Sequence, residues 1–176
     1  MQFGKLHFEP VQQQFSLVAE PTHKTIEALG LKEVYVSEID ETLADTAAFC
    51  EQYGVGLDVS ANCVIVEAKR ADKVWYAACM ILATTRADVN NIIRRRLDAR
   101  KISFAPMDTA TSLTHMMYGG ITPIGLPSDW PILIDTRVND TEHIIIGSGL
   151  RRSKILVPGS LLVKLPNAEV LDIIKE

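Results

Sequence analysis

The stretch HMMYGGITPIGLPSDWPILID, residues 115–135, combines three glycines and three prolines with a short apolar segment that ends in Asp135. Glycine lets a backbone approach a ligand closely, and proline stiffens a loop so that its N–H groups have fixed directions. Such N–H groups can stabilise the oxyanion that develops during acyl transfer or ester hydrolysis. The same composition is also typical of a long surface turn. Asp135 is then either a positioned polar group or a hydrogen-bonded structural carboxylate.

Sequence patterns for other common chemistries are absent or weak. The chain has no G-x-G-x-x-G after a strand, no Walker loop and no G-x-S-x-G nucleophile elbow. Its four histidines are scattered without metal-ligand spacing, so the sequence predicts no metal site. Cys63 is interpreted as a buried apolar thiol rather than a nucleophile. Gly147-Ser148-Gly149 is either an anion-binding backbone nest or a tight turn.

Composition and charge indicate a soluble protein of one domain. Of the 176 residues, 47% are hydrophobic and 23% are charged, and the net charge of −4 gives no basic field that would steer the chain towards nucleic acid. Three cysteines without paired spacing favour free thiols in a reducing compartment. The N-terminus lacks a signal-peptide core, and the apolar run 74–83 is about half of the ~20 residues that a membrane helix needs. We therefore expect a cytoplasmic protein with no membrane segment.

Periodicity and capping patterns predict many short elements along the chain. Helices are expected to begin near Thr22, at Asp40 (ending at Gly54), at the Thr85-x-x-Asp88 capping box, at Asp108 or Thr109, and at Pro158. Strands are expected at 34–36, 61–67, 74–82, 102–105, 132–138, 143–147, 154–157 and 169–173. Hairpin-length connections favour antiparallel pairing. The prediction is a single mixed α/β domain, residues 1–176, with a curved, mainly antiparallel sheet.

The loop resembles a known family signature. Tyr118–Pro127, YGGITPIGLP, is similar to the G-G-[VI]-[ST]-P-[FIL]-G motif of the YbaK family, the prolyl-tRNA-editing-associated domains. Further segments resemble the family's other elements, so that the resemblance covers about residues 42–174: Thr85–Pro106, Ile132–Asp135, Ile144–Arg152 and Ser160–Ile173.

The resemblance implies a freestanding aminoacyl-tRNA deacylase that hydrolyses the ester of a mischarged aminoacyl-tRNA without a cofactor or metal. Its partner would be the 3′ end of the aminoacyl-tRNA, and a homodimer is left open. The implied catalytic positions are Asn62, Gly119, Gly120 and Asp135. The implied substrate-binding residues are His115, Tyr118, Ile121, Thr122, Pro123, Gly125, Gly147, Ser148 and Gly149.

Two positions depart from the family pattern. Asn62 in Asn62-Cys63-Val64-Ile65-Val66 occupies the place of the usual functional lysine, and His115 stands where glycine is common. An amide can orient a water or a ribose hydroxyl but supplies no positive charge. The alternative is therefore a non-catalytic binding module that recognises an aminoacyl or nucleotide end. A lysine from elsewhere in the chain, such as Lys69 or Lys154, would favour the enzyme.

For tRNA, the acidic composition predicts weak, salt-sensitive binding through a local basic patch. Two clusters are candidates, Arg94–Arg96 and the group formed by Arg151, Arg152 and Lys154. The alternative for the arginine run is a solvated helix face.

Overall fold

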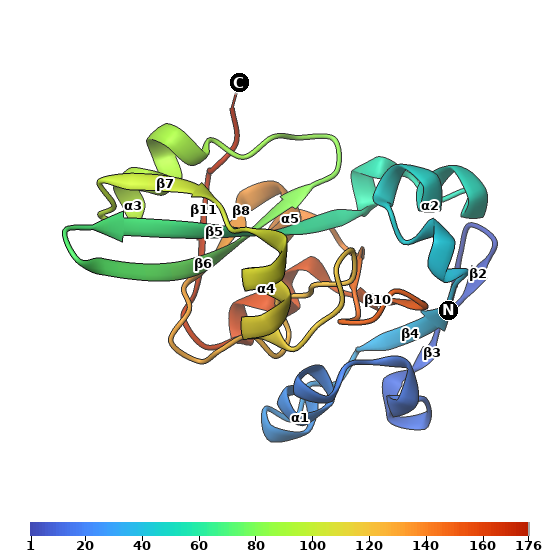
Figure 1. Cartoon of the computed structure of the whole chain (residues 1–176). Coiled ribbons are helices and arrows are strands. Elements are labelled where there is room, and N and C mark those ends of the chain that lie inside the picture. The colour runs from blue at the N-terminus through green and yellow to red at the C-terminus, as the bar shows by residue number, and fades with distance from the viewer. Residues whose placement is uncertain (176) are drawn as a thin grey trace.

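A computed structural model describes residues 1–175 of the chain as a mixed α/β fold with two main sheets. A four-stranded sheet has the order β3-β4-β10-β9, and a five-stranded sheet has the order β11-β8-β6-β5-β7. A small hairpin of β1 (Gln2–Phe3) and β2 (Leu6–His7) lies at the N-terminus. Figure 1 shows α1 and the four-stranded sheet gathered at the end of the molecule opposite α3.

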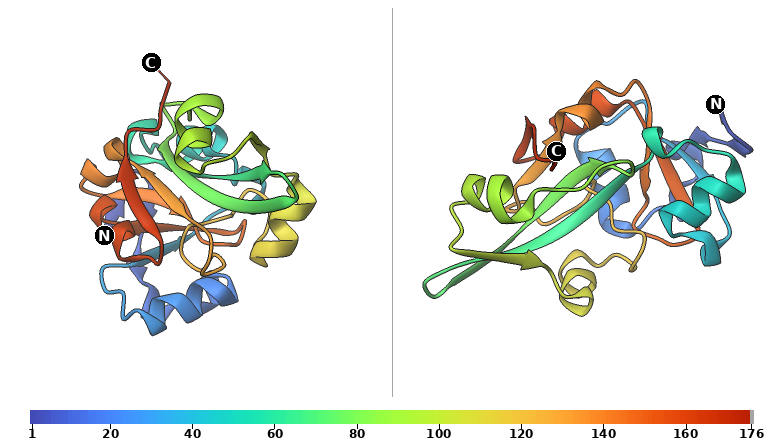
Figure 2. Two further views of the ribbon diagram at one scale, coloured as in Figure 1. Left: turned by 90° about the vertical axis from the view of Figure 1, so that its left-hand side faces the viewer. Right: turned by 90° about the horizontal axis from the view of Figure 1, so that it is seen from above.

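The five-stranded sheet is built on a long hairpin of two apolar strands. β5 (Ala61–Arg70) and β6 (Lys73–Leu82) pair antiparallel along their whole length, as the sequence predicted. β7 (Lys101–Phe104) adds to β5 antiparallel. β8 (Ile132–Asp135) and β11 (Ala168–Leu171) join on the other side in parallel, which the hairpin-length connections did not indicate. The hairpin is curved, and its turn projects from one end of the molecule (Figure 2).

The four-stranded sheet is antiparallel throughout, so antiparallel pairing dominates the fold as predicted. Its strands are β3 (Glu9–Pro10), β4 (Tyr35–Glu38), β9 (Ile144–Gly147) and β10 (Ser153–Val157). β10 lies between β4 and β9, and its five residues are all buried. An isolated parallel bridge between Ser60 and Ile145 connects the start of β5 to β9. The two sheets therefore meet beside β9.

The helices are short, and several begin where a carboxylate caps them. α2 (Thr46–Tyr53) is capped by Asp45, while the predicted cap, Asp40, instead begins a 3₁₀ turn at Glu41–Leu43. Gly54 ends α2 in the left-handed conformation, as predicted. The remaining helical segments are α1 (Glu20–Ala28), a π-helical turn (Val89–Ile93) leading into α3 (Arg94–Arg96), α4 (Met107–Thr114), α5 (Thr136–Asp140), and 3₁₀ turns at Val11–Gln13, Phe15–Leu17, Leu57–Val59 and Gly159–Lys164.

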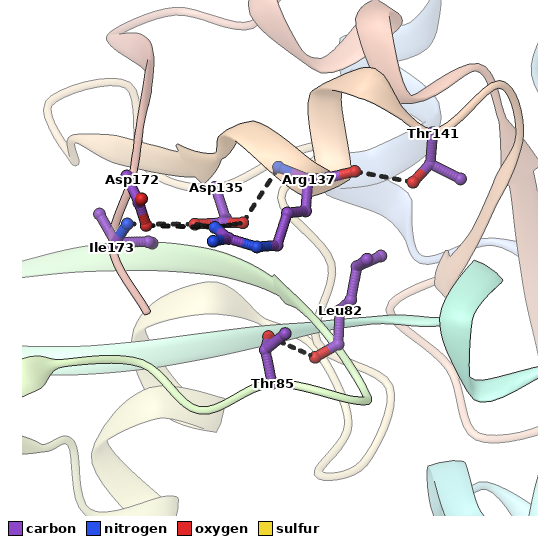
Figure 3. A network of polar contacts seen from close by, with 7 residues as sticks. All are labelled: Leu82, Thr85, Asp135, Arg137, Thr141, Asp172 and Ile173. Carbon is purple, nitrogen blue, oxygen red and sulfur yellow. Dashed lines mark hydrogen bonds and ion pairs between the residues drawn. The ribbon is translucent and has the colours of Figure 1, made fainter. Parts of the chain in front are cut away.

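Three further predicted elements are wrong in start, extent or type. The Thr85-x-x-Asp88 box does not open a helix at Thr85, because the Thr85 hydroxyl donates to the Leu82 carbonyl and Asp88 caps the π-helical turn that begins at Val89 (Figure 3).

The strand expected over 132–138 stops at Asp135, because the Asp135 side chain accepts a hydrogen bond from the Arg137 N–H and thereby starts α5. The helix expected after Pro158 is a 3₁₀ segment, Gly159–Lys164. Its first residue packs so tightly that a Cβ on Gly159 would lie 2.1 Å from the carbonyl oxygen of Val138.

Candidate functional site: a cavity behind the glycine loop

A cavity of about 540 Å³ lies where the glycine loop meets α2, α4 and the start of β5. We call it the loop cavity. It is lined by Asp45, Thr46, Ala61–Ile65, Phe104, Ala105, Met107, Ala110, Tyr118, Gly119, Ile121, Gly147 and Lys154. The walls from β5, β7 and α4 are mostly apolar, while the residues from the start of α2 and from β10 are polar or charged. A cavity of this size can hold a small ligand.

The loop cavity brings together five of the implied site residues: Asn62, Tyr118, Gly119, Ile121 and Gly147. The other implied site residues of the loop lie outside its lining. Within the loop, Gly120, Thr122 and Pro123 are buried against the rest of the fold. His115 is the exposed C-terminal cap of α4, with a left-handed φ of 55°. At Gly125, a Cβ would lie 2.5 Å from the carbonyl carbon of Pro21, so this glycine serves the contact between the loop and α1.

Three cavity-lining residues of the loop have backbone N–H groups without an acceptor. Between residues 1 and 175, no group accepts a hydrogen bond from the N–H of Tyr118, Gly119 or Ile121, and all three residues line the cavity. By contrast, the N–H of Gly120 donates to the Met117 carbonyl at 3.0 Å, and the N–H of Thr122 donates to the Met116 sulfur at 3.5 Å. Gly120 is therefore not one of the available donors.

Close packing on β9 and on the turn after it fixes the position of the loop. A Cβ on Gly147 would lie 2.5 Å from the Gly120 carbonyl oxygen, and a Cβ on Gly120 would lie 2.4 Å from that of Leu150. The Gly149 N–H donates to the Gly120 carbonyl at 2.6 Å. The Arg151 guanidinium donates to the carbonyls of Tyr118 and Glu41 at 2.9 and 3.1 Å, which ties the loop to the segment before α2.

Gly147-Ser148-Gly149 forms the tight turn that was one of its two interpretations. The Ser148 hydroxyl is buried and lies 2.7 Å from the Ser153 hydroxyl, and it also accepts a hydrogen bond from the Leu150 N–H. With the Gly149 N–H bound to Gly120, this turn supports the loop from behind. Gly147 lines the cavity, but Ser148 and Gly149 do not.

Asp135 lies apart from the loop cavity, so its predicted place beside the loop is wrong. Its carboxylate is fully buried and accepts hydrogen bonds from the N–H groups of Arg137 and Ile173 at 3.0 and 3.1 Å (Figure 3). The Arg137 guanidinium lies 3.3 Å from the same carboxylate and 3.1 Å from Asp172. These contacts join α5 to the segment after β11. Asp135 is thus the structural carboxylate of the two alternatives.

Replacing Asp135 should therefore affect stability and spare the chemistry of the loop cavity. We expect Asp135→Asn to lower the free energy of unfolding by about 2 kcal/mol, because the amide weakens a buried ion pair and leaves one donor facing other donors. Chemical denaturation measures this loss. The rate of any reaction in the loop cavity, per folded molecule, should stay within a factor of about three of wild type. A hundredfold loss of rate in a folded Asp135→Asn protein would mean that Asp135 takes part in the reaction.

A polar row crosses the cavity at the ends of three strands. The Asn62 side-chain oxygen accepts a hydrogen bond from the Thr46 hydroxyl at 2.7 Å. Lys154 and Gly147 are directly opposite partners on β10 and β9. Residues opposite one another on antiparallel strands place their side chains on the same face. The Lys154 side chain therefore extends from the face of the sheet on which the glycine loop rests.

The sequence considered Lys154 both for a surface patch for tRNA and as a lysine that could enter the pocket, and the structure places it, buried, in the lining of the loop cavity. Its side chain is 7% exposed, and its ammonium donates to the Ala44 carbonyl at 3.0 Å and lies 5.2 Å from the centre of the Phe49 ring. Burial lowers the pKa of Lys154 to about 8. The apolar neighbours Ile155–Val157 were the available signal, because they indicate a strand that is buried on both faces. Lys69, the other lysine considered, pairs with Glu67 away from the cavity.

Cys63 also lines the cavity, but it lacks the character of a nucleophile. It is half-buried, and burial, with a smaller effect of Cys79, raises the pKa of its thiol. The thiol is therefore protonated at neutral pH and adds to the apolar wall.

The arginines proposed for tRNA contact are largely engaged in the fold. Arg96 pairs with Glu169, Arg94 donates to the Asn90 carbonyl, and Arg152 donates to the Ser16 carbonyl. The Arg95 side chain is exposed and makes no ion pair or hydrogen bond within residues 1–175. Arg151 holds the loop, as described above. Along residues 1–175 the structure has no cluster of three metal-ligating side chains and no helix long and apolar enough to cross a membrane.

Comparison with known proteins gives a consistent picture. Residues 40–165 match the family described as the aminoacyl-tRNA editing domain. A candidate trans-editing enzyme for prolyl tRNA synthetase is 15% identical and superposes with a TM-score of 0.75, over 89% of this chain and 96% of that one. A hypothetical protein is 19% identical with a TM-score of 0.77, over 89% of this chain and all of that one. A scaffold from computational epitope grafting is 16% identical, with a TM-score of 0.76 over 90% and 97% of the two chains. At these identities the superpositions establish the fold.

Proposed function

Because the chain belongs to the aminoacyl-tRNA editing domain family, we propose that its loop cavity hydrolyses the ester bond of a mischarged aminoacyl-tRNA. The observation that carries this proposal is the set of unpartnered N–H groups of Tyr118, Gly119 and Ile121 beside a cavity whose walls from β5, β7 and α4 are mostly apolar. Apolar walls suit an amino-acid side chain, and free amide donors suit a carbonyl oxygen that becomes negatively charged.

The reaction is a simple hydrolysis. The oxygen of a water molecule bonds to the ester carbonyl carbon, and the carbonyl oxygen becomes an oxyanion that accepts hydrogen bonds from the unpartnered loop N–H groups. The bond between that carbon and the ribose oxygen then breaks, and the ribose oxygen takes up the proton that the water loses. The products are the free amino acid and a tRNA with a free terminal hydroxyl.

A deacylation screen tests this function. Purified protein is incubated at fixed salt with a panel of aminoacyl-tRNAs, including mischarged ones, and the remaining ester is measured over time. We expect hydrolysis of a restricted set of these esters at rates well above the spontaneous rate. Salt must be fixed because binding to tRNA weakens steeply as its concentration rises. If no ester in the full panel is cleaved faster than in buffer alone, the proposal is wrong.

Exposed apolar side chains at the mouth of the cavity provide a place for the unpaired nucleotides of the tRNA end. Phe104, Met107 and Tyr118 line the cavity and are 65%, 51% and 58% exposed. Bases of single-stranded nucleic acid stack on such aromatic groups, with about 1–3 kcal/mol per base. We propose that a terminal base of the tRNA stacks on Tyr118 or Phe104.

Removing the Tyr118 ring should weaken binding of the tRNA end. We expect Tyr118→Ala to raise the Kd for a short CCA-ending RNA by about tenfold, because one stacking contact is lost. Tyr118→Phe is the matched control, since it keeps the ring and removes the hydroxyl, and its Kd should equal that of wild type. Fluorescence anisotropy with a labelled RNA measures both. Equal affinities for wild type and Tyr118→Ala would remove Tyr118 from the binding site.

A non-catalytic binding module is the second candidate, and Asn62 favours it. This residue supplies no charge at the position where the family pattern has a functional lysine, and its amide oxygen is already bonded to Thr46. Binding of a non-hydrolysable aminoacyl-adenosine analogue, together with no turnover of any ester in the panel, would support this candidate over the hydrolase.

A further inference from the structure

Lys154 is a buried cation without a counterion. Its side chain is 7% exposed, yet throughout residues 1–175 no carboxylate lies within ion-pair distance of its ammonium. One of its three donors is used by the Ala44 carbonyl. Burial of an unpaired charge opposes folding, so a lysine at this position lowers the stability of the fold. Methionine or leucine would fill the same space at a lower cost.

The neighbouring strands explain how this ammonium reaches the cavity. Lys154 is opposite Gly147, which has no side chain, and the Ser60–Ile145 bridge places the start of β5 on the other side of β9. β5 contacts β9, and Asn62 lies two residues after Ser60, as Gly147 lies two residues after Ile145. Asn62, Gly147 and Lys154 all line the loop cavity.

We propose that Lys154 supplies the positive charge of the loop cavity and that its ammonium stabilises the ester oxyanion together with the loop N–H groups. The assignment rests on the proposed hydrolysis and adds the residue that provides the charge which Asn62 lacks. The ammonium keeps its proton throughout, so the reaction remains the hydrolysis written above. A cation held in a partly desolvated site acts on a developing anion more strongly than it would in water.

The surroundings of Lys154 set the pH range over which the charge is present. Burial lowers its pKa to about 8, with Arg151 acting in the same direction, while Cys50 and Asp45 of α2 and its cap oppose the shift. At neutral pH most molecules therefore carry the ammonium. Catalysis that needs the charged form should be constant below pH 8 and should fall as pH rises through about 8. A lysine acting as a neutral base would give the opposite slope.

The test compares deacylation by wild type, Lys154→Met and the exchange variant Asn62→Lys/Lys154→Asn, after correction for spontaneous hydrolysis at each pH. Lys154→Met keeps the length of the side chain and removes the charge. We expect a loss of at least a hundredfold at pH 7, since one group that stabilises an oxyanion contributes roughly that much. The exchange variant should recover at least a tenth of the wild-type rate. Lys164→Met, at an exposed lysine outside the cavity, is the control and should match wild type.

The outcomes separate this inference from the proposed function. If wild type hydrolyses an ester and Lys154→Met does so within threefold, the hydrolase stands and the assignment of Lys154 is wrong. If the rate rises through pH 8 in wild type and that rise is lost in Lys154→Met, the lysine acts as a base and the assigned cationic role is overturned. If wild type hydrolyses nothing in the panel, the proposed hydrolase is wrong, and the assignment of Lys154, which rests on it, is wrong as well.

Discussion

Gly147→Ala should reduce deacylation by a hundredfold or more while the protein remains folded. The new methyl group would lie 2.5 Å from the Gly120 carbonyl oxygen and 2.7 Å from that of Ile121, distances that real Cβ atoms do not adopt. Both contacts are backbone atoms of the glycine loop, so no flexible side chain can yield. The loop must move away from β9, and the N–H groups of Gly119 and Ile121 move with it.

The size of this effect follows from the geometry that an oxyanion site needs. A displacement of about 1 Å in a catalytic group can lower a rate a hundredfold, and the loss of one donor alone lowers it by roughly 10²–10³. Overpacking of a tight contact costs about 1–3 kcal/mol of stability. We expect the protein to stay folded despite this loss of stability, while the displaced loop lowers the deacylation rate. Single-turnover deacylation and thermal melting, measured on the same sample, separate the two quantities.

Gly30→Ala is the matched control for this substitution. Gly30 has a left-handed φ of 57° and no atom within 4 Å of the position that an added methyl group would take, so alanine there costs backbone strain of about 1–2 kcal/mol without a collision. It follows α1, outside the lining of the loop cavity. Its activity should equal that of wild type at a similar loss of stability. If Gly147→Ala is as active as Gly30→Ala, the loop does not carry the reaction.

The sequence identified the loop because its signal is local. Glycine and proline report backbone constraints at their own positions, and Gly119, Gly147 and their neighbours do lie where bare backbone is required. The resemblance to the editing family added Asn62, which lines the same cavity. Antiparallel pairing was also predictable for β5 and β6, because the short charged segment 69–73 separates two apolar runs.

The role of Asp135 could not be predicted, because an aspartate after an apolar strand suits two structures equally. It can point into a cleft, or it can turn back to cap the helix that follows. The choice depends on the N–H of Ile173 and the guanidinium of Arg137, of which the former is 38 residues away in the chain. The parallel pairing of β8 with β6 and β11 has the same origin, since it depends on long-range packing.

For Lys154 the sequence left two places open, a surface patch for tRNA and the pocket, and its burial in the cavity lining agrees only with the second. Lysine is rarely buried, and two adjacent arginines made a surface patch the natural interpretation. The following residues, Ile155–Val157, pointed to a strand covered on both faces, and this should have outweighed the charge. A lysine buried in such a strand destabilises the fold, and a role in the reaction would explain why it is retained. Measuring the stability of a Lys154 variant beside its activity tests whether both effects occur.

Lys154→Met should raise the thermal stability of the protein at neutral pH while it lowers activity. The folded protein holds the pKa of Lys154 at about 8, mainly through burial, against an ordinary value of 10.5. Each unit of such a shift corresponds to about 1.4 kcal/mol, so protonated Lys154 costs the fold roughly 3 kcal/mol at pH 7. Methionine removes this cost, and a gain of several degrees in Tm should follow.

The stability difference between Lys154→Met and wild type should depend on pH in a defined direction. Between pH 8 and 10.5 the unfolded chain binds more protons at this lysine than the folded chain does, so the stability of wild type rises with pH in that window. Below pH 8 both states are protonated and the cost is fully present. The advantage of Lys154→Met should therefore be constant below pH 8 and should shrink as pH approaches 10.5. Melting curves at pH 7 and pH 10, with Lys164→Met as the control, measure it.

Two results would contradict this account of a buried, uncompensated charge. A Lys154→Met protein that melts below wild type at pH 7 would mean that the ammonium stabilises the fold through the Ala44 carbonyl and the Phe49 ring. A difference in Tm that is the same at pH 7 and pH 10 would mean that the charge is already compensated. We expect a variant that is more stable and less active than wild type. This trade-off between stability and activity arises when a functional site retains a group that destabilises the fold. Such a trade-off at Lys154 would identify the charge as functional.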